Sequence, residues 1–251
     1  MSKIALTGNA LGSGTLTLAA PNSNTDRTLT LPDEAGTVLT NTSGVAKTGD
    51  TMTGALTIQN AGFDSKITLQ NTGTGGQTFN LFSTMNSFTQ GGGNLMFHTS
   101  SAPNGILKMD ASGRVTMPYQ PAFHANFLGT GQVSSSTSSG VLVFDEVPLN
   151  IGGHYSTANG RFTAPVSGSY WFSVTWQHHA PDGTSGGFVD LYRNNVGYYR
   201  YRAETTNVAG YQTTTVSGII YLNTNDYVTC FANRLSAMHA HYTAFSGFLV
   251  G

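Results

Sequence analysis

The sequence predicts an all-β protein in which a β-rich N-terminal shaft precedes a jelly-roll β-sandwich head. Three observations support this fold class. Only 9% of the 251 residues are charged, and glycine occurs 31 times. Thr, Ser, Asn and aromatic residues outnumber helix-forming Lys, Glu and Gln, which favours strands and turns. Short runs that alternate apolar and polar residues recur along the chain, which is the period of half-buried strands.

The third observation is a change of composition near Pro118–Pro121. All 11 Tyr and both Trp lie at Tyr119 or later, whereas every Lys precedes Tyr119. The two prolines of this segment also interrupt regular structure. We therefore expect an N-terminal attachment segment at 1–46, a shaft at 47–120 and a globular head at 121–251.

The first half contains short Thr/Leu alternations separated by turn-rich spacers. Each run has an apolar face of only two or three small side chains, which is too little to bury a core within one chain. Several copies wrapped around a common axis would bury these faces against one another. The alternative is an ordinary low-complexity β-domain or a partly disordered leader. The runs are Thr15–Leu18, Thr28–Leu31, Thr37–Thr40, Ala55–Ile58 and Lys66–Leu69.

The second half contains about nine strand candidates, with turn signals between them. This number of short strands is typical of a two-sheet sandwich. The candidates are Phe123–Phe127, Val141–Val147, Gly160–Ala164, Ser169–Trp176, Gly187–Arg193, Gly197–Arg202, Gln212–Leu222, Tyr227–Ala232 and His241–Val250.

An aromatic and glycine pattern runs through the start of this half. Aromatic residues at every second position after a Pro/Gly turn indicate a strand with one face in a core. The pattern consists of Phe144, Asn150, Tyr155, Phe162, Gly168, Tyr170, Phe172 and Val174. Its spacing resembles the signature of the complement C1q globular head, a relative of tumour necrosis factor. Only Val174 departs from the signature, because that family prefers Phe or Tyr at this position.

The C-terminal segment Tyr242–Val250 resembles the closing strand of the same family. The resemblance therefore extends over the whole second half. It implies a head that binds a partner, does not catalyse a reaction, and assembles as a tight trimer through aromatic surfaces.

A second resemblance lies in the first half. Lys47–Leu56 is similar to a Gly-Asp-Thr-Met repeat of bacteriophage tail fibres, and Thr25–Thr40 is similar to a segment common in phage virion proteins. Lys108–Pro118 resembles the end of a fibre shaft that leads into its tip. The resemblance implies a trimeric fibre shaft, which would supply the common axis that the first half requires.

The two resemblances together predict a homotrimeric phage tail fibre, or receptor-binding protein, that mediates host adhesion. Such a fibre is made in the host cytoplasm and is located in the virion tail. Its N-terminal portion would bind other virion proteins, and its head would bind a bacterial surface glycan or an outer-membrane protein. The alternatives are a structural virion component (head fibre, decoration spike or minor tail protein) and a non-phage bacterial surface protein with the same head.

Charge, apolar length and motifs argue against other classes. A formal net charge of -1 gives no basis for nucleic-acid binding, and no window is long and apolar enough for membrane insertion or a secretory signal. Neighbouring carboxylates such as Asp33–Glu34 and Asp145–Glu146 point to opposite faces of a strand and cannot flank one bond. Cys230, the single cysteine, reads as a buried apolar residue. We predict no catalytic residues and no cofactor.

The densest group of recognition-type side chains is Tyr198–Arg202. Tyr and Arg are favoured at binding hot spots. We predict that Tyr198, Tyr199, Arg200, Tyr201 and Arg202 contact a receptor, together with His178 and His179 beside a long loop, although packing within the trimer would also use such side chains.

His239 and His241 are spaced to share one face of a strand. In a trimer this pair would present six nitrogens to an axial metal. Two surface histidines are the simpler interpretation, and the prediction is that there is no metal site.

Overall fold

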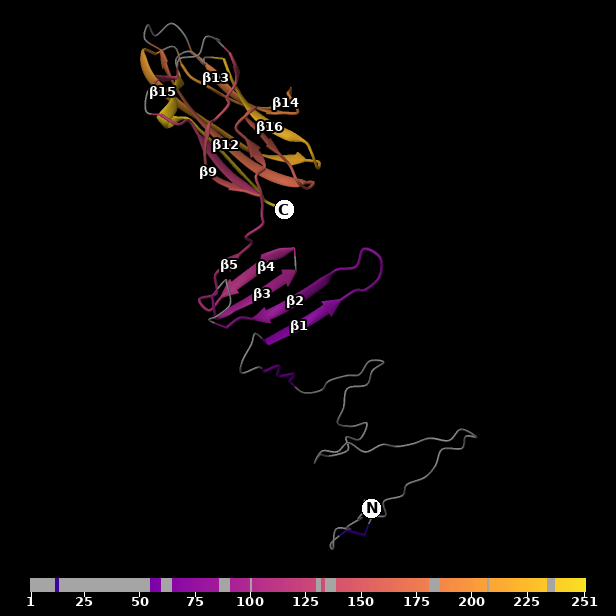
Figure 1. The fold of residues 1–251 in the computed structure, drawn as a ribbon. Helices are drawn as coiled ribbons and strands as arrows, with labels where there is room; N and C mark the ends of the chain where they lie inside the picture. The colour runs from indigo at the N-terminus through magenta and orange to yellow at the C-terminus, as the bar shows by residue number, and fades with distance from the viewer. Residues whose placement is uncertain are drawn as a thin grey trace. The chain divides into compact units, whose positions relative to one another are not determined.

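The structure of the 251-residue chain is a computed structural model (Figure 1). It describes residues 12–13, 55–59, 65–85, 91–99, 101–129, 132–133, 139–180, 186–206, 208–233 and 238–251. The chain divides into units of residues 1–56 and 57–251. Most of the first unit lies outside the described residues, including the runs Thr15–Leu18, Thr28–Leu31 and Thr37–Thr40 and residues 47–54 of the Gly-Asp-Thr-Met motif.

The described part of the chain is built from β-strands, apart from one turn of 3-10 helix, η2 (Ala240–Tyr242). The predicted all-β fold class is therefore confirmed. None of the described helical residues forms a segment long and apolar enough to cross a membrane.

Five antiparallel strands form one sheet in the order β1-β2-β3-β4-β5. They are β1 (Ser65–Gln70), β2 (Thr78–Ser83), β3 (Asn94–Thr99), β4 (Ala102–Asp110) and β5 (Val115–Thr116). The predicted run Lys66–Leu69 lies in β1 and is confirmed, whereas Ala55–Ile58 is described as irregular and exposed, so a strand there is wrong. Strands β2, β3 and most of β4 were not predicted from the sequence.

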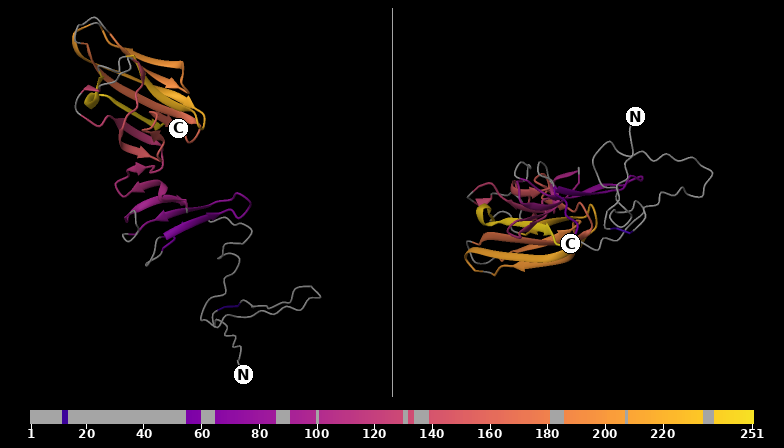
Figure 2. Two further views of the ribbon diagram at one scale, coloured as in Figure 1. Left: turned by 45° about the horizontal axis from the view of Figure 1, so that its top comes forward. Right: turned by 90° about the horizontal axis from the view of Figure 1, so that it is seen from below.

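The head contains two further sheets, which lie face to face (Figure 2). The first has the order β10-β11-β16-β13-β14, with β8 also pairing to β16. Its strands are β8 (Gly140–Val141), β10 (Tyr155–Ser156), β11 (Arg161–Thr163), β13 (Phe188–Arg193), β14 (Val196–Glu204) and β16 (Tyr227–Ala232).

The second head sheet has the order β7-β17-β12-β18-β6-β9, with β15 also pairing to β12. Its strands are β6 (Ala122–Asn126), β7 (Gln132–Val133), β9 (Glu146–Ile151), β12 (Gly168–Ala180), β15 (Gly210–Leu222), β17 (Met238–His239) and β18 (Ala244–Leu249). Strands β12 and β15 pair along their whole length, from Gly168↔Leu222 to Ala180↔Gly210.

Residue alternation in β12 separates a buried face from a partly exposed one. Tyr170, Phe172, Val174 and Trp176 are fully buried, and the residues between them are not. Successive side chains on a strand point to opposite faces, so this apolar half of β12 lies against the other head sheet. The alternation predicted from Tyr170 to Val174 is confirmed and extends to Trp176.

A tight turn joins β13 to β14. Asn194 and Asn195 have φ values of 50° and 61°. Two consecutive left-handed residues are typical of a type I′ hairpin turn, whose twist matches that of the strands, and Asn tolerates this region better than most residues. The register shifts between this turn and the pair Asp190↔Arg202, since Arg193 pairs with Val196 but Leu191 pairs with Tyr201.

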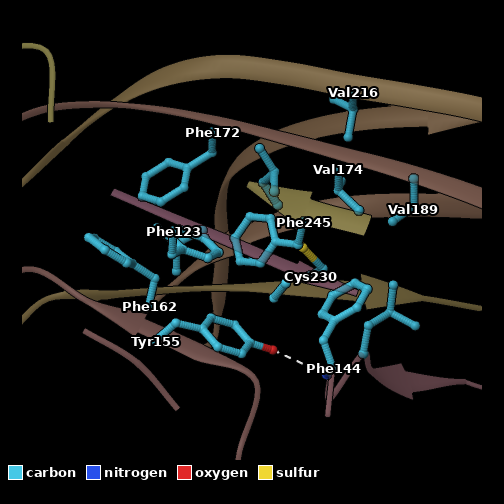
Figure 3. Packing of buried hydrophobic residues seen from close by; sticks show 14 of the residues in the cluster. Phe123, Phe144, Tyr155, Phe162, Phe172, Val174, Val189, Val216, Cys230 and Phe245 are labelled. Carbon is cyan, nitrogen blue, oxygen red and sulfur yellow. Dashed lines mark hydrogen bonds between the residues drawn. The ribbon is translucent and has the colours of Figure 1, made fainter. Parts of the chain in front are cut away.

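Aromatic rings fill the space between the two head sheets (Figure 3). The Phe123 ring centroid lies 5.1 Å from Tyr155, 5.0 Å from Phe162 and 4.8 Å from Phe245. The Tyr155 hydroxyl accepts a hydrogen bond from the backbone N–H of Phe144 at 3.1 Å (Figure 3). Burial raises the pKa of the Tyr155 phenol, which stays neutral. These contacts stabilise the sandwich by burying apolar surface and by ring packing.

The remaining members of the sequence pattern also have structural roles. The Asn150 side chain donates to the carbonyl of Tyr155 at 2.9 Å and accepts from its N–H at 3.1 Å. A Cβ atom at Gly168 would lie 2.9 Å from Leu249 and 3.0 Å from the Gly251 carbonyl oxygen. Val174 is fully buried opposite Phe245. Because Phe245 supplies an aromatic ring beside it, a smaller residue at position 174 is accommodated.

Most strand candidates of the second half are confirmed, and two differ. The candidate Val141–Val147 divides between β8 and β9, with residues 142–145 outside regular structure. The candidate His241–Val250 begins only at Ala244, because the 3-10 turn η2 occupies Ala240–Tyr242.

Candidate recognition and self-association surfaces of the head

One face of the second head sheet carries no charged residue on four of its strands. The sequences of β6, β12, β15 and β18 contain no Asp, Glu, Lys or Arg. We call the side chains of these strands that point away from the core the uncharged face. The solvent-exposed face of a sheet normally carries charged side chains, whereas the core of a protein–protein interface is depleted of them.

Apolar side chains form a row at one end of the uncharged face. Trp171 pairs with Ile219 on β15 and with Phe248 on β18. The Trp171 and Phe248 rings lie 5.4 Å apart. Ile219, Tyr221 and Phe248 are all exposed. An exposed aromatic and aliphatic row of this kind is the feature expected at the centre of a protein contact.

Hydroxyl and amide groups occupy the middle of the uncharged face. Thr175 Oγ1 and Thr215 Oγ1 lie 3.0 Å apart, and the Gln177 side chain donates to Thr213 Oγ1 at 2.8 Å. His124 Nδ1 lies 2.7 Å from Ser246 Oγ. These short polar side chains satisfy one another across strands, so the surface is flat and free of long charged groups.

Histidine and tyrosine rings gather at the opposite end of the uncharged face. The His179 ring lies 4.6 Å from Tyr211, and Tyr211 lies 5.6 Å from His239. Tyr242 contacts His239 at 4.9 Å and His241 at 5.1 Å. This group was not predicted from the sequence, because its rings come from three segments that only the fold brings together.

The predicted receptor residue Arg202 is held within the other head sheet. Its guanidinium donates to both carboxylate oxygens of Asp190, at 2.9 and 2.8 Å, and lies 3.7 Å from the centroid of the Phe188 ring. Asp190 is fully buried. The hydrogen bonds that Arg202 donates to Asp190 raise the pKa of Arg202. Arg202 therefore compensates a buried charge, which is a structural role that sequence alone did not show.

Tyr201 is also engaged within the fold. Its hydroxyl donates to the carbonyl of Ile219 at 3.0 Å, and a Cβ atom at Gly218 would lie 2.5 Å from its ring. The residues Tyr198, Tyr199 and Arg200 lie in β14, which is the last strand in its sheet order. Their side chains lie outside the described residues, so their receptor contact stays a prediction.

The two neighbouring histidines of β12 have different environments. His178 is fully buried, and its ring stacks on Trp176 at 4.6 Å with an interplanar angle of 8°. A buried imidazole is not presented to a receptor. His179 points to the opposite face and is partly exposed beside Tyr211. The loop 181–185 that follows lies outside the described residues.

His239 and His241 do not share one strand face as the spacing predicted. The chain enters η2 after His239, and the backbone N–H of Thr243 donates to the carbonyl of Ala240. The 3-10 turn replaces strand alternation, so the premise of the axial pair is wrong. Among the described residues, no three or more His, Cys, Asp or Glu side chains form a metal-binding group.

The carboxylates described in the head have structural partners. Asp145 accepts from the N–H of Leu128 at 2.6 Å, and Glu146 accepts from the Asn126 side chain. Asp226 accepts from Asn194 and Arg193, each at 2.6 Å. The hydrogen bond from Asn194 is the main cause of the lowered pKa of Asp226.

Cys230, fully buried in β16, has a pKa that burial raises well above its ordinary value. A thiol held neutral in this way is a poor nucleophile. This agrees with the prediction that Cys230 is a core residue.

The head is similar to known proteins. A family model described as the C1q domain matches residues 122–250. Complement C1q tumor necrosis factor-related protein 3 of Mus musculus is 27% identical over 133 residues, which are 52% of this chain and 52% of that protein. The protein of the same name from Homo sapiens is 26% identical over 133 residues, with the same coverage. The chain thus spans about half the length of the curated relatives it matches.

Solved structures similar to the chain include the globular domain of zebrafish complement 1qA protein, at 18% identity and a TM-score of 0.41. It covers 53% of this chain and 98% of that one. Murine APRIL at pH 5.0 has 14% identity and a TM-score of 0.43, and the match covers 52% of this chain and 99% of that one.

These relatives contradict the phage identification that was predicted from the sequence. The matched relatives are animal complement C1q tumor necrosis factor-related proteins. The identification as a phage tail fibre, a virion component or a bacterial surface protein is therefore wrong, as is the virion localisation. The relatives give no support for the virion and bacterial partners. The short Gly-Asp-Thr-Met and Thr/Leu motifs that suggested these lie outside the matched residues 122–250.

Proposed function

Because the chain belongs to the C1q domain family, we propose that it is a recognition protein that works as a homotrimer of its head. The family assignment agrees with the prediction that the chain is not an enzyme. It also supports self-association of the head. We propose that three copies assemble, and that the uncharged face of the head joins them.

The observation that carries this proposal is the uncharged face. It combines an apolar row around Trp171, internally satisfied hydroxyl groups and an absence of charge on β6, β12, β15 and β18. A specific interface of standard size buries about 800 Å² on each partner, and a sheet of this length offers such an area. The other head sheet has ion pairs at Arg202–Asp190 and Arg193–Asp226, so it is the less suitable contact.

Ligand recognition would then use surfaces that remain accessible around the trimer. We place it at β14, where Tyr198, Tyr199 and Arg200 supply the aromatic and guanidinium groups typical of hot spots. Arg202 and Tyr201 support this strand from within. His178 is removed from the proposed site because it is buried, and His179 is assigned to the uncharged face.

A single charge on the uncharged face tests the assembly. Ile219→Asp would bury a carboxylate without a partner in the interface, and we expect the full-length chain to dissociate. Val196→Asp places the same charge at an exposed residue in the β13–β14 hairpin and is the matched control. Mass photometry should give trimers for the wild type and the control and monomers for Ile219→Asp. Trimers for both variants would exclude this face.

A second experiment tests the ligand site independently of assembly. Labelled full-length protein is titrated onto cultured animal cells, with Arg200→Ala compared to Arg161→Ala, which lies on β11. Saturable binding should weaken about tenfold or more for Arg200→Ala, as for a hot spot, and stay unchanged for the control. Equal binding by both trimeric variants would remove β14 as the recognition site.

A further inference from the structure

The sheet of β1 to β5 has one face made almost entirely of exposed apolar side chains. Cross-strand register brings Ile67, Leu81, Phe97 and Leu107 into one row. A second row runs from Ser83 through Leu95 and Met109 to Val115. Leu69 and Phe79 form a further pair. We call the nine apolar residues of these rows the apolar sheet face.

The exposure of these side chains is high for their size. The exposed fractions are 40% for Ile67, 66% for Leu69, 44% for Phe79, 44% for Leu95, 47% for Phe97, 40% for Met109 and 51% for Val115. At about 70–80 Å² of exposed surface for each half-exposed large side chain, these seven present roughly 500 Å². A contiguous apolar patch of this size marks an interaction site.

The opposite face of the same sheet is different. It carries Lys66, Thr68, Asn80, His98 and Lys108, together with Phe82 and the fully buried Met96. Thr68 donates to the Asn80 side chain at 2.9 Å. The opposite face is therefore mixed and its Met96 is covered, whereas the apolar sheet face is exposed. An exposed apolar face of a sheet requires a second layer. In the described part of the chain no element covers this face, as the exposed fractions above indicate.

We propose that the apolar sheet face packs against the same face of other copies of this chain, as a second assembly contact separate from the head. The face has no charged side chain, so identical faces meet without repulsion. Its roughly 500 Å² supplies most of the about 800 Å² per partner of a standard interface, and the strand edges supply the remainder.

The connection to the head strengthens this choice of occupant. Only residues 117–121 separate β5 from β6, the first strand of the head. This inference rests on the proposed self-association of the head, because an assembled head holds the sheets of its copies at high effective concentration. A contact that is weak on its own then forms within the assembly.

Cysteine probes in the full-length chain test the proposal. Ile67→Cys and Leu81→Cys place a thiol on the apolar sheet face, and Lys66→Cys and Asn80→Cys place one on the opposite face of the same strands. The native Cys230 is buried and serves as the background. Under mild oxidation we expect covalent dimers from at least one probe of the first pair and at most trace amounts from the second pair.

Two other results would overturn the inference. Rapid alkylation of both Ile67→Cys and Leu81→Cys in assembled protein would mean that the face is open to solvent. Protection from alkylation without any crosslink would mean that another segment, such as residues 1–56 of the same chain, or a different partner covers it. The mass of every variant is measured in parallel, since a monomeric chain would refute the head assembly, whereas an assembled chain with an open face refutes only this contact.

A second pair of variants tests the contact without cysteine probes, in case the probes disturb folding. Phe97→Asp introduces a charge into the centre of the apolar sheet face, and Lys108→Asp introduces it on the other face. Both should keep the mass of the head assembly. Only Phe97→Asp should speed hydrogen exchange across β1 to β3, by tenfold or more. Equal exchange in both variants would contradict the packing.

Discussion

Removal of the Arg202 guanidinium is expected to destabilise the head strongly. In Arg202→Met the carboxylate of Asp190, which is fully buried, loses both of its guanidinium hydrogen bonds. Removing one partner of a buried ion pair costs about 3–5 kcal/mol. The Arg202 side chain is 32% exposed, so water reaches part of the site. We therefore expect about 3 kcal/mol, the low end of that range.

Differential scanning calorimetry at one fixed protein concentration measures this effect. For a domain of about 130 residues, 3 kcal/mol corresponds to a fall in Tm of about 11 °C. The matched control is Glu204→Gln, since Glu204 is 3.7 Å from Arg202 and well exposed, and it should change Tm by less than about 2 °C. A Tm unchanged in Arg202→Met would refute the structural role and return Arg202 to the candidate ligand residues.

A compensating substitution separates loss of charge pairing from loss of packing. Phe188 and Phe231 lie beside Asp190, so an apolar residue at position 190 would have apolar neighbours. The double variant Asp190→Leu with Arg202→Met should recover at least half of the lost stability, because a buried ion pair is replaceable by apolar residues. Failure to recover would mean that the Arg202 side chain stabilises mainly through its own packing.

Three further predictions concern other parts of the head. Gly247→Ala should lower the free energy of unfolding of the head by about 1–3 kcal/mol, because the new Cβ would lie 2.5 Å from the Phe172 ring. Ser173→Ala, on the exposed side of β12, is the control and should have little effect. Urea unfolding measures both variants. Because its pKa is lowered in the folded state, ionised Asp226 stabilises the fold at pH values above the ordinary Asp pKa of about 4, and this contribution is lost as the pH falls through the lowered pKa. Asp226→Asn should therefore flatten the acid side of a plot of Tm against pH. An unchanged plot would contradict this. Cys230 should react with a thiol reagent only at the rate of global unfolding, and rapid reaction in the native state would disprove its burial.

The sequence predicted the head well because its signal is local. In β12 the alternation of Tyr170, Phe172 and Val174 decides which side chains enter the core, and neighbouring strands repeat the same period. Such a period depends only on residues close together in sequence. The uncharged face could also be predicted from the sequence, since four predicted strands contain no charged residue, although it was not predicted above.

The strands β2 and β3 were missed because their pattern mixes the two faces. Leu81 and Phe82 are adjacent, and Leu95, Met96 and Phe97 form a continuous apolar run. Alternation therefore does not mark one face as buried. The reason is visible in the structure, where Met96 is buried on one side of the sheet and the apolar sheet face lies on the other.

The structural role of Arg202 could not be predicted for a different reason. Arg202 and Asp190 are twelve residues apart, and the β13–β14 hairpin, with its register shift between Leu191 and Arg193, places them opposite each other. No local pattern reveals that an Arg has a buried carboxylate as its partner. The spacing of His239 and His241 was misread similarly, because a 3-10 turn interrupts the strand. Cross-strand partners and short irregular turns are tertiary properties.

The mass of the full-length protein in solution tests the central claim most directly. Analytical ultracentrifugation at micromolar concentration should give three times the 26.5 kDa of one chain, with no dependence on ionic strength because the uncharged face needs no ion pairs. A species of 26.5 kDa at the same concentration would contradict self-association through the head.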